Sequence, residues 1–546
     1  MRKHFLVLTI LLSFILPSAA FSQTAKVDVT AAEKKMAETI TAQQLSDYLH
    51  FVASDAMGGR DTPSQGLDVT AEFLAFNLKR WGFKPAGDNG TFFQKMMLTG
   101  GSIDPSKVSF KVGTSSLKYG DDFFLLSGEG NGSGGLVFVK DGWVIKSKNH
   151  NDFAGIDVKD KYIVIKGDGF NGRGINPPSG ITPDDLKGEK GTDWSDPMTY
   201  AKANGAKGVV LLASARIQSA WSQIGGFLGR GRMSVEGLGG TPRGGAQGKE
   251  LPMILVSNDT GNAIFSGESG TADSAAAFDI KKTISLEAPN SKTRIPTQNV
   301  VAIWEGGDPK VKDEMVAVGA HYDHVGTRPD AKGDDKIWNG ADDDGSGTVA
   351  VLAIAEALAK SKTRPNRSIL FVWHAGEEKG LWGSEYFNKY PTVDINKVVA
   401  QLNIDMIGRS KKEGDTNEKN KELSGPDEIY VIGSEMMSST LGAVTKGTND
   451  AYLKLKYNYR YDDPKDPNRF FFRSDHFNYA VNGIPVAFWF DGVHEDYHGA
   501  GDHPDKIDYQ KMEKITRTIF LTLWEISDLK VRPAIDKQLP PELTRR

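Results

Sequence analysis

The feature that most constrains the fold is a regular alternation of apolar strands and helices from Asn299 onward. Four apolar runs are long enough to form buried strands: Met315–Ala320, Ser368–Trp373, Val398–Ile404 and Ile484–Phe490. Helical patterns cover Thr348–Ala359 and Gln510–Leu529. Continuous apolar strands that alternate with helices indicate a sheet that is covered on both faces. We therefore expect an α/β fold with a mixed, mainly parallel sheet flanked by helices.

Polar side chains follow the ends of these expected strands. They are His321 and Asp323, the triplet Asp342–Asp344, Glu377 and Glu378, Asp405, and Tyr497 and His498. In open α/β sheets ligands bind beyond the carboxyl ends of the strands, so we expect these distant segments to meet at one edge. Imidazoles and carboxylates suit zinc, or alternatively cobalt or manganese. The chain contains no cysteine, which excludes thiol catalysis and zinc–thiolate sites.

The donors are numerous enough to hold two ions, with a carboxylate of the aspartate triplet between them. Two ions about 3.5–4 Å apart polarise a carbonyl and lower the pKa of a shared water. A further carboxylate must accept the proton of that water and deliver it to the leaving amine. The adjacent Glu377 and Glu378 can supply one base and one ligand. Asp323 can hold the second ring nitrogen of His321 and so fix its tautomer.

Six motifs together resemble those of the zinc aminopeptidase family, a family of two-zinc, co-catalytic exopeptidases that includes glutamate carboxypeptidase and the transferrin receptor. The motifs are His321–Asp323, Gly340–Gly347, Ala375–Leu381, Asn403–Gly408, Arg473–His476 and Asp496–His498. Two further segments, Met57–Asp61 and Phe92–Gln94, are similar to motifs that the family carries near its N-terminus. The resemblance extends over nearly all of the mature chain and implies a zinc-exopeptidase fold.

The resemblance also implies roles for single residues. The five metal ligands would be His321, Asp343, Glu378, Asp405 and His498. Asp343 would bridge two Zn²⁺ ions, and Glu377 would act as the general base. Tyr497 would stabilise the oxyanion, and Arg473 would lie near the bound peptide substrate.

The activity implied is that of an exopeptidase, with an aminopeptidase that removes N-terminal residues as the main hypothesis. A carboxypeptidase or dipeptidase on the same scaffold is the alternative, because specificity depends on the shape of the pocket. A non-catalytic binding protein is a third hypothesis, which the complete ligand set and the presence of Glu377 disfavour. The three differ in a simple way, because only a carboxypeptidase should cleave peptides with an acetylated N-terminus.

His494–His498 also matches the HExxH pattern of a different class of metalloprotease. That pattern binds zinc only on a helix, where the two histidines share a face. Gly492, Gly499 and Pro504 disfavour a helix here. We therefore expect a loop that delivers Tyr497 and His498, and no role in zinc binding for the pattern as a whole.

Composition divides the chain into four parts: a signal peptide at 1–22, an N-terminal part of the catalytic domain at 23–127, an insert at 128–280 and the main catalytic domain at 281–546. The insert contains short β-like runs and resembles the protease-associated domain that many family members carry. Its glycine-rich stretch 225–248 lacks the setting of a dinucleotide site and is expected to be flexible surface.

The N-terminus predicts export to the periplasm or the medium. Arg2 and Lys3 precede an apolar run from Phe5 to Leu16, and small residues follow it. A run of this length is too short to span about 30 Å of hydrocarbon, so we expect cleavage and no membrane anchor afterwards. The net charge of −4 disfavours binding to nucleic acid, because such binding requires excess positive charge.

Overall fold

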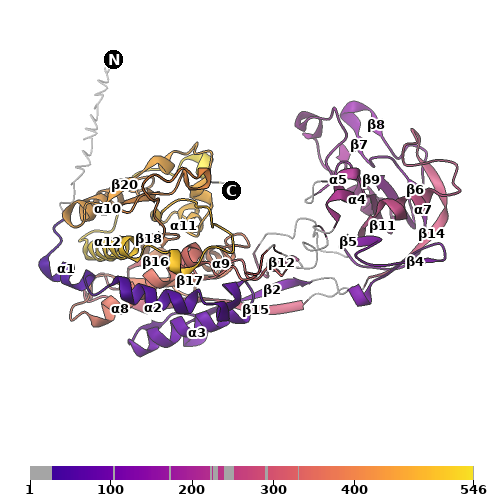
Figure 1. Cartoon of the computed structure of the whole chain (residues 1–546). Coiled ribbons are helices and arrows are strands. Elements are labelled where there is room, and N and C mark those ends of the chain that lie inside the picture. Colours follow the sequence, from indigo (N-terminus) through magenta and orange to yellow (C-terminus); the bar gives the residue numbers. More distant parts are fainter. Residues whose placement is uncertain are drawn as a thin grey trace, which may run out of the picture.

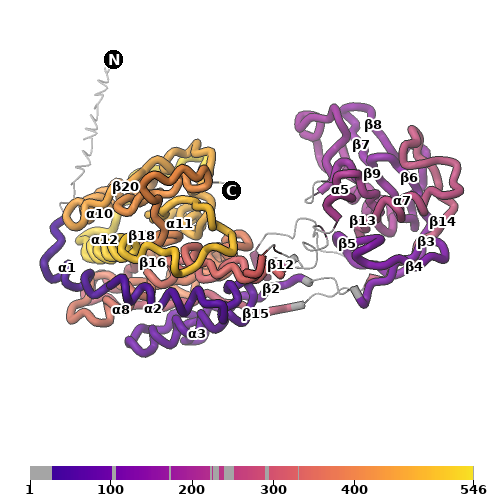
Figure 2. Tube along the Cα trace, viewed as in Figure 1, coloured from indigo at the N-terminus to yellow at the C-terminus, as the bar shows by residue number. Residues whose placement is uncertain are grey.

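The computed structural model describes residues 27–101, 105–170, 174–221, 224, 232–238, 251–288, 293–329, 331 and 333–544. The predicted signal peptide and most of the glycine-rich stretch lie outside the described residues. Figure 1 shows two lobes connected through the region of strands β2, β12 and β15. The tube along the chain shows the second lobe in purple to pink, so it consists of sequence inserted between the indigo and the orange parts of the main lobe (Figure 2).

The main lobe contains a ten-stranded mixed sheet, as expected. Its order is β12 (Arg232–Val235), β2 (Phe93–Gly101), β15 (Thr293–Trp304), β17 (Ser368–His374), β16 (Met315–His321), β18 (Val398–Ile404), β21 (Val486–Phe490), β19 (Glu428–Ile432) and β20 (Lys456–Asn458), with β1 (Lys84–Pro85) paired to β15. The four central strands β17, β16, β18 and β21 are parallel. Their carboxyl ends therefore meet along one edge of the sheet.

Helices cover both faces of this sheet because its central strands are apolar on both sides. Along β16, Val316 and Val318 enter the core of one face, and Met315 and Ala317 enter the core of the other. The first face packs against α1 (Ala31–Ala37), α2 (Ala42–Val52), α3 (Gln65–Arg80), α8 (Gly347–Lys360), α10 (Ser439–Ala451) and α12 (Tyr509–Asp528). The second face packs against α9 (Trp382–Lys389) and α11 (His476–Val481).

The second lobe is built on an eight-stranded sheet with its own apolar cores. The order is β4 (Ser115–Leu117), β3 (Ser109–Val112), β14 (Phe278–Ala288), β6 (Gly130–Phe138), β9 (Lys161–Lys166), β11 (Gly208–Leu212), β13 (Met253–Val256) and β5 (Phe123–Ser127). A three-stranded sheet, α4 (Pro197–Ala203), α5 (Ala215–Ser219) and α7 (Asn258–Phe265) complete it. The sheet thus begins before residue 128 and ends after residue 280, so it is larger than the predicted insert.

One strand from the glycine-rich stretch belongs to the main lobe. Strand β12 pairs with β2 in antiparallel register, Val235 opposite Leu98. Just after it, the carbonyl oxygen of Gly237 accepts hydrogen bonds from Lys389 Nζ at 2.7 Å and from the Tyr390 hydroxyl at 2.8 Å. This part of the stretch is therefore an ordered edge strand, because pairing with β2 satisfies its backbone, and the expectation of flexible surface is wrong there.

None of the helices that the structure describes is both long and apolar enough to cross a lipid bilayer.

Candidate metal centre and active site

The carboxyl edge of the four parallel strands carries the predicted site. His321 is the last residue of β16, and Asp405 follows β18 directly. Glu377 and Glu378 lie in the loop after β17, and Tyr497 and His498 lie in the loop after β21. The segment Ala341–Ser346, which leads into α8, adds the aspartate triplet. The register of the parallel strands thus brings five segments that are distant in sequence to one place.

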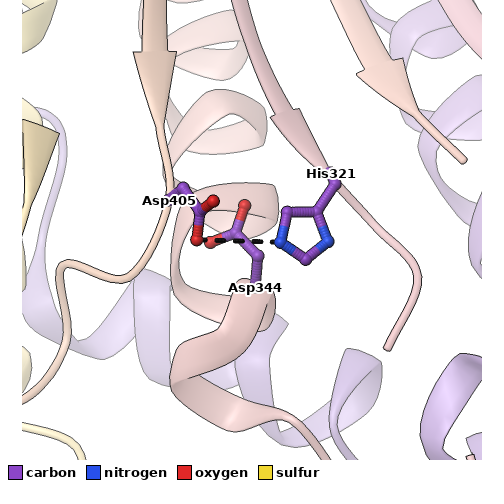
Figure 3. Close-up of side chains that lie close together, drawn as sticks. All are labelled: His321, Asp344 and Asp405. Atoms are coloured by element: carbon purple, nitrogen blue, oxygen red, sulfur yellow. Dashed lines mark ion pairs between the residues drawn. The ribbon is translucent and has the colours of Figure 1, made fainter. Parts of the chain in front are cut away.

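His321, Asp344 and Asp405 form one group of potential metal ligands, and all three are buried. Figure 3 shows their polar atoms turned toward one another from two strand ends and the start of a helix. Nε2 of His321 lies 3.7 Å from Oδ1 of Asp405 and 3.3 Å from Oδ1 of Asp343. The group is thus compact enough for a single ion to contact several of these atoms.

A second group contains His324, Asp343 and Glu378. Nδ1 of His324 lies 2.9 Å from Oε1 of Glu378. Nε2 of His498 joins the group at 2.9 Å from Oε2 of Glu378 and 3.1 Å from Oδ2 of Asp343. Sequence reasoning missed His324, although it stands three residues after His321 in the same loop, a spacing that brings a second imidazole to the strand end.

Asp343 connects the two groups through its two carboxylate oxygens. Oδ1 faces His321 at 3.3 Å, and Oδ2 faces His498 at 3.1 Å. Its neighbour Asp344 has a different setting, because Oδ1 of Asp344 accepts hydrogen bonds from the backbone of Gly347 and Met406. Asp342 belongs to neither group and contacts Nε2 of His494 through Oδ2 at 3.3 Å. Among the three aspartates, Asp343 therefore has the geometry of a bridge.

Asp323 lies beside His321 but contacts it differently from the expectation. Nδ1 of His321 is 3.1 Å from the backbone carbonyl oxygen of Asp323 and 3.6 Å from its carboxylate. The carboxylate instead accepts hydrogen bonds from the backbone N–H of Glu377 at 3.1 Å and from the hydroxyl of Thr62 at 3.1 Å. Asp323 thus holds the histidine through its main chain and holds the loop of Glu377 through its side chain.

The donor set fits divalent cations. Within the described residues, buried polar atoms without a hydrogen-bond partner include Oδ2 of Asp343, Oδ2 of Asp344, Oε1 of Glu378, Nε2 of His498 and both ring nitrogens of His324. These atoms approach one another closely without the alignment of a hydrogen bond. Buried polar groups are rarely left unpaired in folded proteins, and imidazole with carboxylate is a zinc-type donor set.

The charge of the cluster also favours a cation. Burial lowers the pKa of His498, but Asp343 and Glu378 outweigh it and raise the pKa to about 10. Burial raises the pKa of Asp343, but His321 and His498 outweigh it and hold the pKa well below the usual range. The Asp343 carboxylate is thus kept ionised and the His498 imidazole has a high proton affinity; both properties favour a cation, which competes with protons for the same atoms.

Glu377 faces the pocket beside these groups. Burial raises the pKa of Glu377 well above the usual range. The positive charge of His321 lowers this pKa, and the negative charges of Glu378 and Asp405 raise it further. Of the two groups found in the described part of the chain, Glu377 belongs to neither. A carboxylate beside a metal centre, with raised proton affinity and no ligand role, has the setting of a general base.

The pocket has a polar floor and an apolar wall. His321, Asp343, Glu377 and Asp405 line the floor, and Met406, Phe470, Phe488, Phe490 and Val493 line the wall. Arg473 and Tyr497 also line it, and Nη2 of Arg473 donates a hydrogen bond to the Tyr497 hydroxyl at 3.2 Å. Burial and the charge of Asp343 raise the pKa of Tyr497 well above its usual range, so its hydroxyl stays protonated as a donor.

The HExxH pattern lies in a loop, as expected. Residues 491–499 form extended and turn structure, not a helix. His494 turns to Asp342, and the carboxylate of Glu495 is exposed and accepts a hydrogen bond from Asn417. The two histidines therefore do not share a helical face, and only His498 reaches the metal groups.

Part of the chain is similar in sequence to known peptidases. Residues 299–523 match the sequence model of Peptidase family M28. Leucine aminopeptidase 2 of Arthroderma otae is 27% identical over 282 residues, which is 47% of this chain and 50% of that protein. A probable leucine aminopeptidase of the same organism is 30% identical over 229 residues, 40% of this chain and 56% of its own length. The chain thus spans about half the length of these relatives.

Solved structures are similar over most of their length. The aminopeptidase from Aneurinibacillus sp. strain AM-1 has a TM-score of 0.49 at 17% identity, over 93% of this chain and 98% of its own. A zinc aminopeptidase from Bacillus subtilis has a TM-score of 0.46 at 17% identity, over 92% and 99%.

The matched segment contains all five predicted ligands together with Glu377 and Tyr497. This match and the names of the relatives support the predicted class, a hydrolytic metallopeptidase. The segment 299–523 is thus similar in sequence to Peptidase family M28.

Proposed function

We propose that the protein is an exported two-zinc aminopeptidase that removes N-terminal residues from peptides. The observation that carries this proposal is the division of donors into two groups joined by the two oxygens of Asp343. His321 and Asp405 would hold one ion, Glu378 and His498 the other, and Asp343 both. Cobalt and manganese suit the same donors.

The bound ions would polarise the scissile carbonyl and lower the pKa of a water between them. Glu377 would accept the proton of that water and return it to the leaving amine, because it faces the same pocket with a raised proton affinity. The backbone of Glu377 is fixed by Asp323, which keeps the base in one position. General-base catalysis of this kind contributes about 10²- to 10⁴-fold.

Tyr497 would stabilise the oxyanion of the tetrahedral intermediate. Its protonated hydroxyl lines the pocket together with the ligands and receives a hydrogen bond from Arg473. That bond orients the phenol and leaves its own proton available for the oxyanion. Donors aimed at developing negative charge commonly contribute most to catalysis in such sites.

The apolar wall supports a preference for apolar terminal side chains. Met406, Phe470 and Phe488 are hydrocarbon or thioether surfaces beside the reactive floor. Burial of a leucine-sized side chain against such surfaces is favourable by about 1.5–3 kcal/mol. The names of the relatives, leucine aminopeptidases, point in the same direction.

A carboxypeptidase or dipeptidase is the second candidate, and Arg473 is the observation that favours it. The guanidinium lies at the pocket with its side chain exposed, where it could pair with the terminal carboxylate of a peptide. Arginine suits carboxylates because its planar group binds them through two hydrogen bonds.

The test uses the purified mature protein with matched apolar peptides that bear a free or an acetylated N-terminus. Products are identified by mass, with and without a chelator. Stepwise, chelator-sensitive loss of N-terminal residues from the free peptides alone is the expected result. Cleavage of the acetylated peptides from their C-terminus would replace the aminopeptidase with a carboxypeptidase. The mature N-terminus recovered from an exporting host, after about residue 22, tests the export proposal in the same preparation.

A further inference from the structure

His324 is a buried imidazole that the five-residue ligand set leaves without a role. Its side chain is fully buried, 0% exposed. Within the part of the chain that the structure describes, neither ring nitrogen has a hydrogen-bond partner. A neutral imidazole has one donor and one acceptor to satisfy, so a buried one without either partner requires an explanation.

The ring is aimed at the second metal group. Nδ1 lies 2.9 Å from Oε1 of Glu378 and 3.7 Å from Oδ2 of Asp343. The other oxygen of Glu378 contacts Nε2 of His498 at 2.9 Å. The two imidazole rings are 5.8 Å apart between centroids and inclined at 69°. Two imidazoles and two carboxylates thus surround one volume from different directions, which is the donor number of a tetrahedral zinc site.

The surrounding backbone holds His324 in this position. The N–H of His324 donates to the carbonyl oxygen of Arg60 at 3.1 Å, and the guanidinium of Arg60 donates to the carbonyl oxygen of Tyr322 at 2.9 Å. Gly340 passes so close that a Cβ there would stand 2.4 Å from Cγ of His324. The glycine therefore leaves the space that the ring occupies.

The alternative is that His324 only orients Glu378 by a hydrogen bond. In that arrangement Nδ1 would donate to Oε1 along the line of the N–H bond. The two atoms are close enough, but their geometry does not meet the alignment of a hydrogen bond. With His498 and Asp343 on the other sides of the same volume, the imidazole and carboxylate donors match a zinc donor set.

We propose that His324 is a fourth protein ligand, through Nδ1, of the ion held by Glu378, His498 and Asp343. The inference rests on the proposed two-zinc function and goes beyond its five ligands. The two sites then differ, because the first has His321, Asp343 and Asp405 and keeps a position free for substrate. The second has four protein donors, so we expect it to bind its ion more tightly and to fill first when zinc is added to metal-free protein; the shared water would be its fifth ligand.

The direct test is a crystal structure of the zinc-loaded protein with anomalous scattering at the zinc edge. A distance of about 2.0–2.1 Å from Nδ1 of His324 to the second ion is expected. Two bound ions with this nitrogen more than about 3 Å from either ion would overturn the inference and leave the proposed function intact. Failure to bind two ions would instead contradict the proposed function.

Zinc titration of metal-free protein against a chelating dye tests the same point without crystals. His324→Gln should weaken the tighter site more than about 100-fold, as should His498→Gln, and should leave the looser site unchanged. A loss of about 100-fold or less is the size produced by residues that only orient a ligand, and it would overturn the inference. His476→Gln is the matched control, because His476 is equally buried but stacks on Phe488 at 4.5 Å. Circular dichroism of the metal-free variants establishes that each is folded.

Discussion

Glu377 and Glu378 are adjacent in the chain but have different partners. The two oxygens of Glu378 contact the imidazoles of His324 and His498, each at 2.9 Å. Glu377 faces the pocket, and only its backbone is fixed, by Asp323. One residue of the pair therefore suits a ligand and the other a base.

Glu377→Gln should keep both zinc ions and lose about 10²- to 10⁴-fold in kcat, because the amide cannot accept a proton. Zinc is quantified by atomic absorption and turnover is measured on an unblocked peptide. Glu495→Gln is the control, since Glu495 is an exposed glutamate of the HExxH pattern and should retain full activity. Loss of zinc from Glu377→Gln would show that Glu377 is a ligand, and inactivity of Glu495→Gln would revive the HExxH interpretation.

His476 should make the main lobe sensitive to acid. Burial lowers its pKa from 6.5 to about 3, against the charge of Asp475. Between these values the unfolded chain binds a proton that the folded protein does not, so stability rises with pH in this window. For one proton the slope is about 1.4 kcal/mol per pH unit. Stability is therefore lost as the pH falls from about 6.5 toward about 3.

Denaturant unfolding of metal-free wild type and His476→Phe from pH 3 to 7 measures this slope. The variant lacks the imidazole and should show a slope smaller by about one proton. Equal slopes in the two proteins would contradict the assignment of this acid sensitivity to His476.

At the scale of elements, the strands predicted from sequence are those buried on both faces. Val398–Ile404 has the same bounds as β18, and Met315–Ala320 differs from β16 by one residue. A strand buried on both faces can be predicted from sequence, because every position must be apolar. An edge strand lacks this pattern. Strand β12 has four residues within a glycine-rich stretch, and only its pairing with β2 makes it a strand.

Some residues of the site can likewise be predicted from the local sequence, and others depend on contacts between distant segments. The strand-end position of His321 and Asp405 follows from the strand pattern, and the resemblance singles out Asp343. The spacing of His324 places it near the strand end, but its contacts and those of Arg60 are made between loops, which the local sequence does not show. Arg60 is fully buried and donates hydrogen bonds to the carbonyl oxygens of Val52, Tyr322, Asn339 and Gly340. The local sequence does not indicate whether an arginine will bind backbone carbonyl groups or a carboxylate.

Gly340→Ala should disrupt the loop that carries the aspartates. Its φ is +60°, and an added Cβ would stand 2.4 Å from the carbonyl oxygen of Asp343 and 2.4 Å from Cγ of His324. Gly414→Ala is the control, because Gly414 also has positive φ, +76°, but has no atom within 4 Å of the added Cβ. Both variants carry the strain of a positive φ, and Gly340→Ala adds a steric cost of about 1–3 kcal/mol. Equal unfolding free energies for the two variants would contradict the close approach.

At the scale of the whole molecule, the two lobes have separate cores and should unfold separately. Phe138 and Val164 belong to a core of the second lobe, and Val318 and Trp373 belong to a core of the main lobe. Zinc would bind only to the main lobe, so it should stabilise only that unit. A ligand at 100 times its dissociation constant adds about 2.7 kcal/mol to the stability of the unit that binds it.

Calorimetry with and without a chelator measures the unfolding temperature of each lobe and its dependence on zinc. We expect two transitions, of which the chelator lowers one and leaves the other at the same temperature. One transition that shifts as a whole, or an equal shift of both, would contradict the independence of the lobes.

The measurement that tests the central claim most directly is turnover as a function of zinc added to metal-free protein. An unblocked peptide with an apolar N-terminal residue is the substrate, and bound zinc is measured in each sample. The two groups joined by Asp343 predict that activity requires occupancy of both sites and reaches its plateau at about two ions per chain. Full activity with one ion, or activity that persists in metal-free protein, would contradict the two-zinc site.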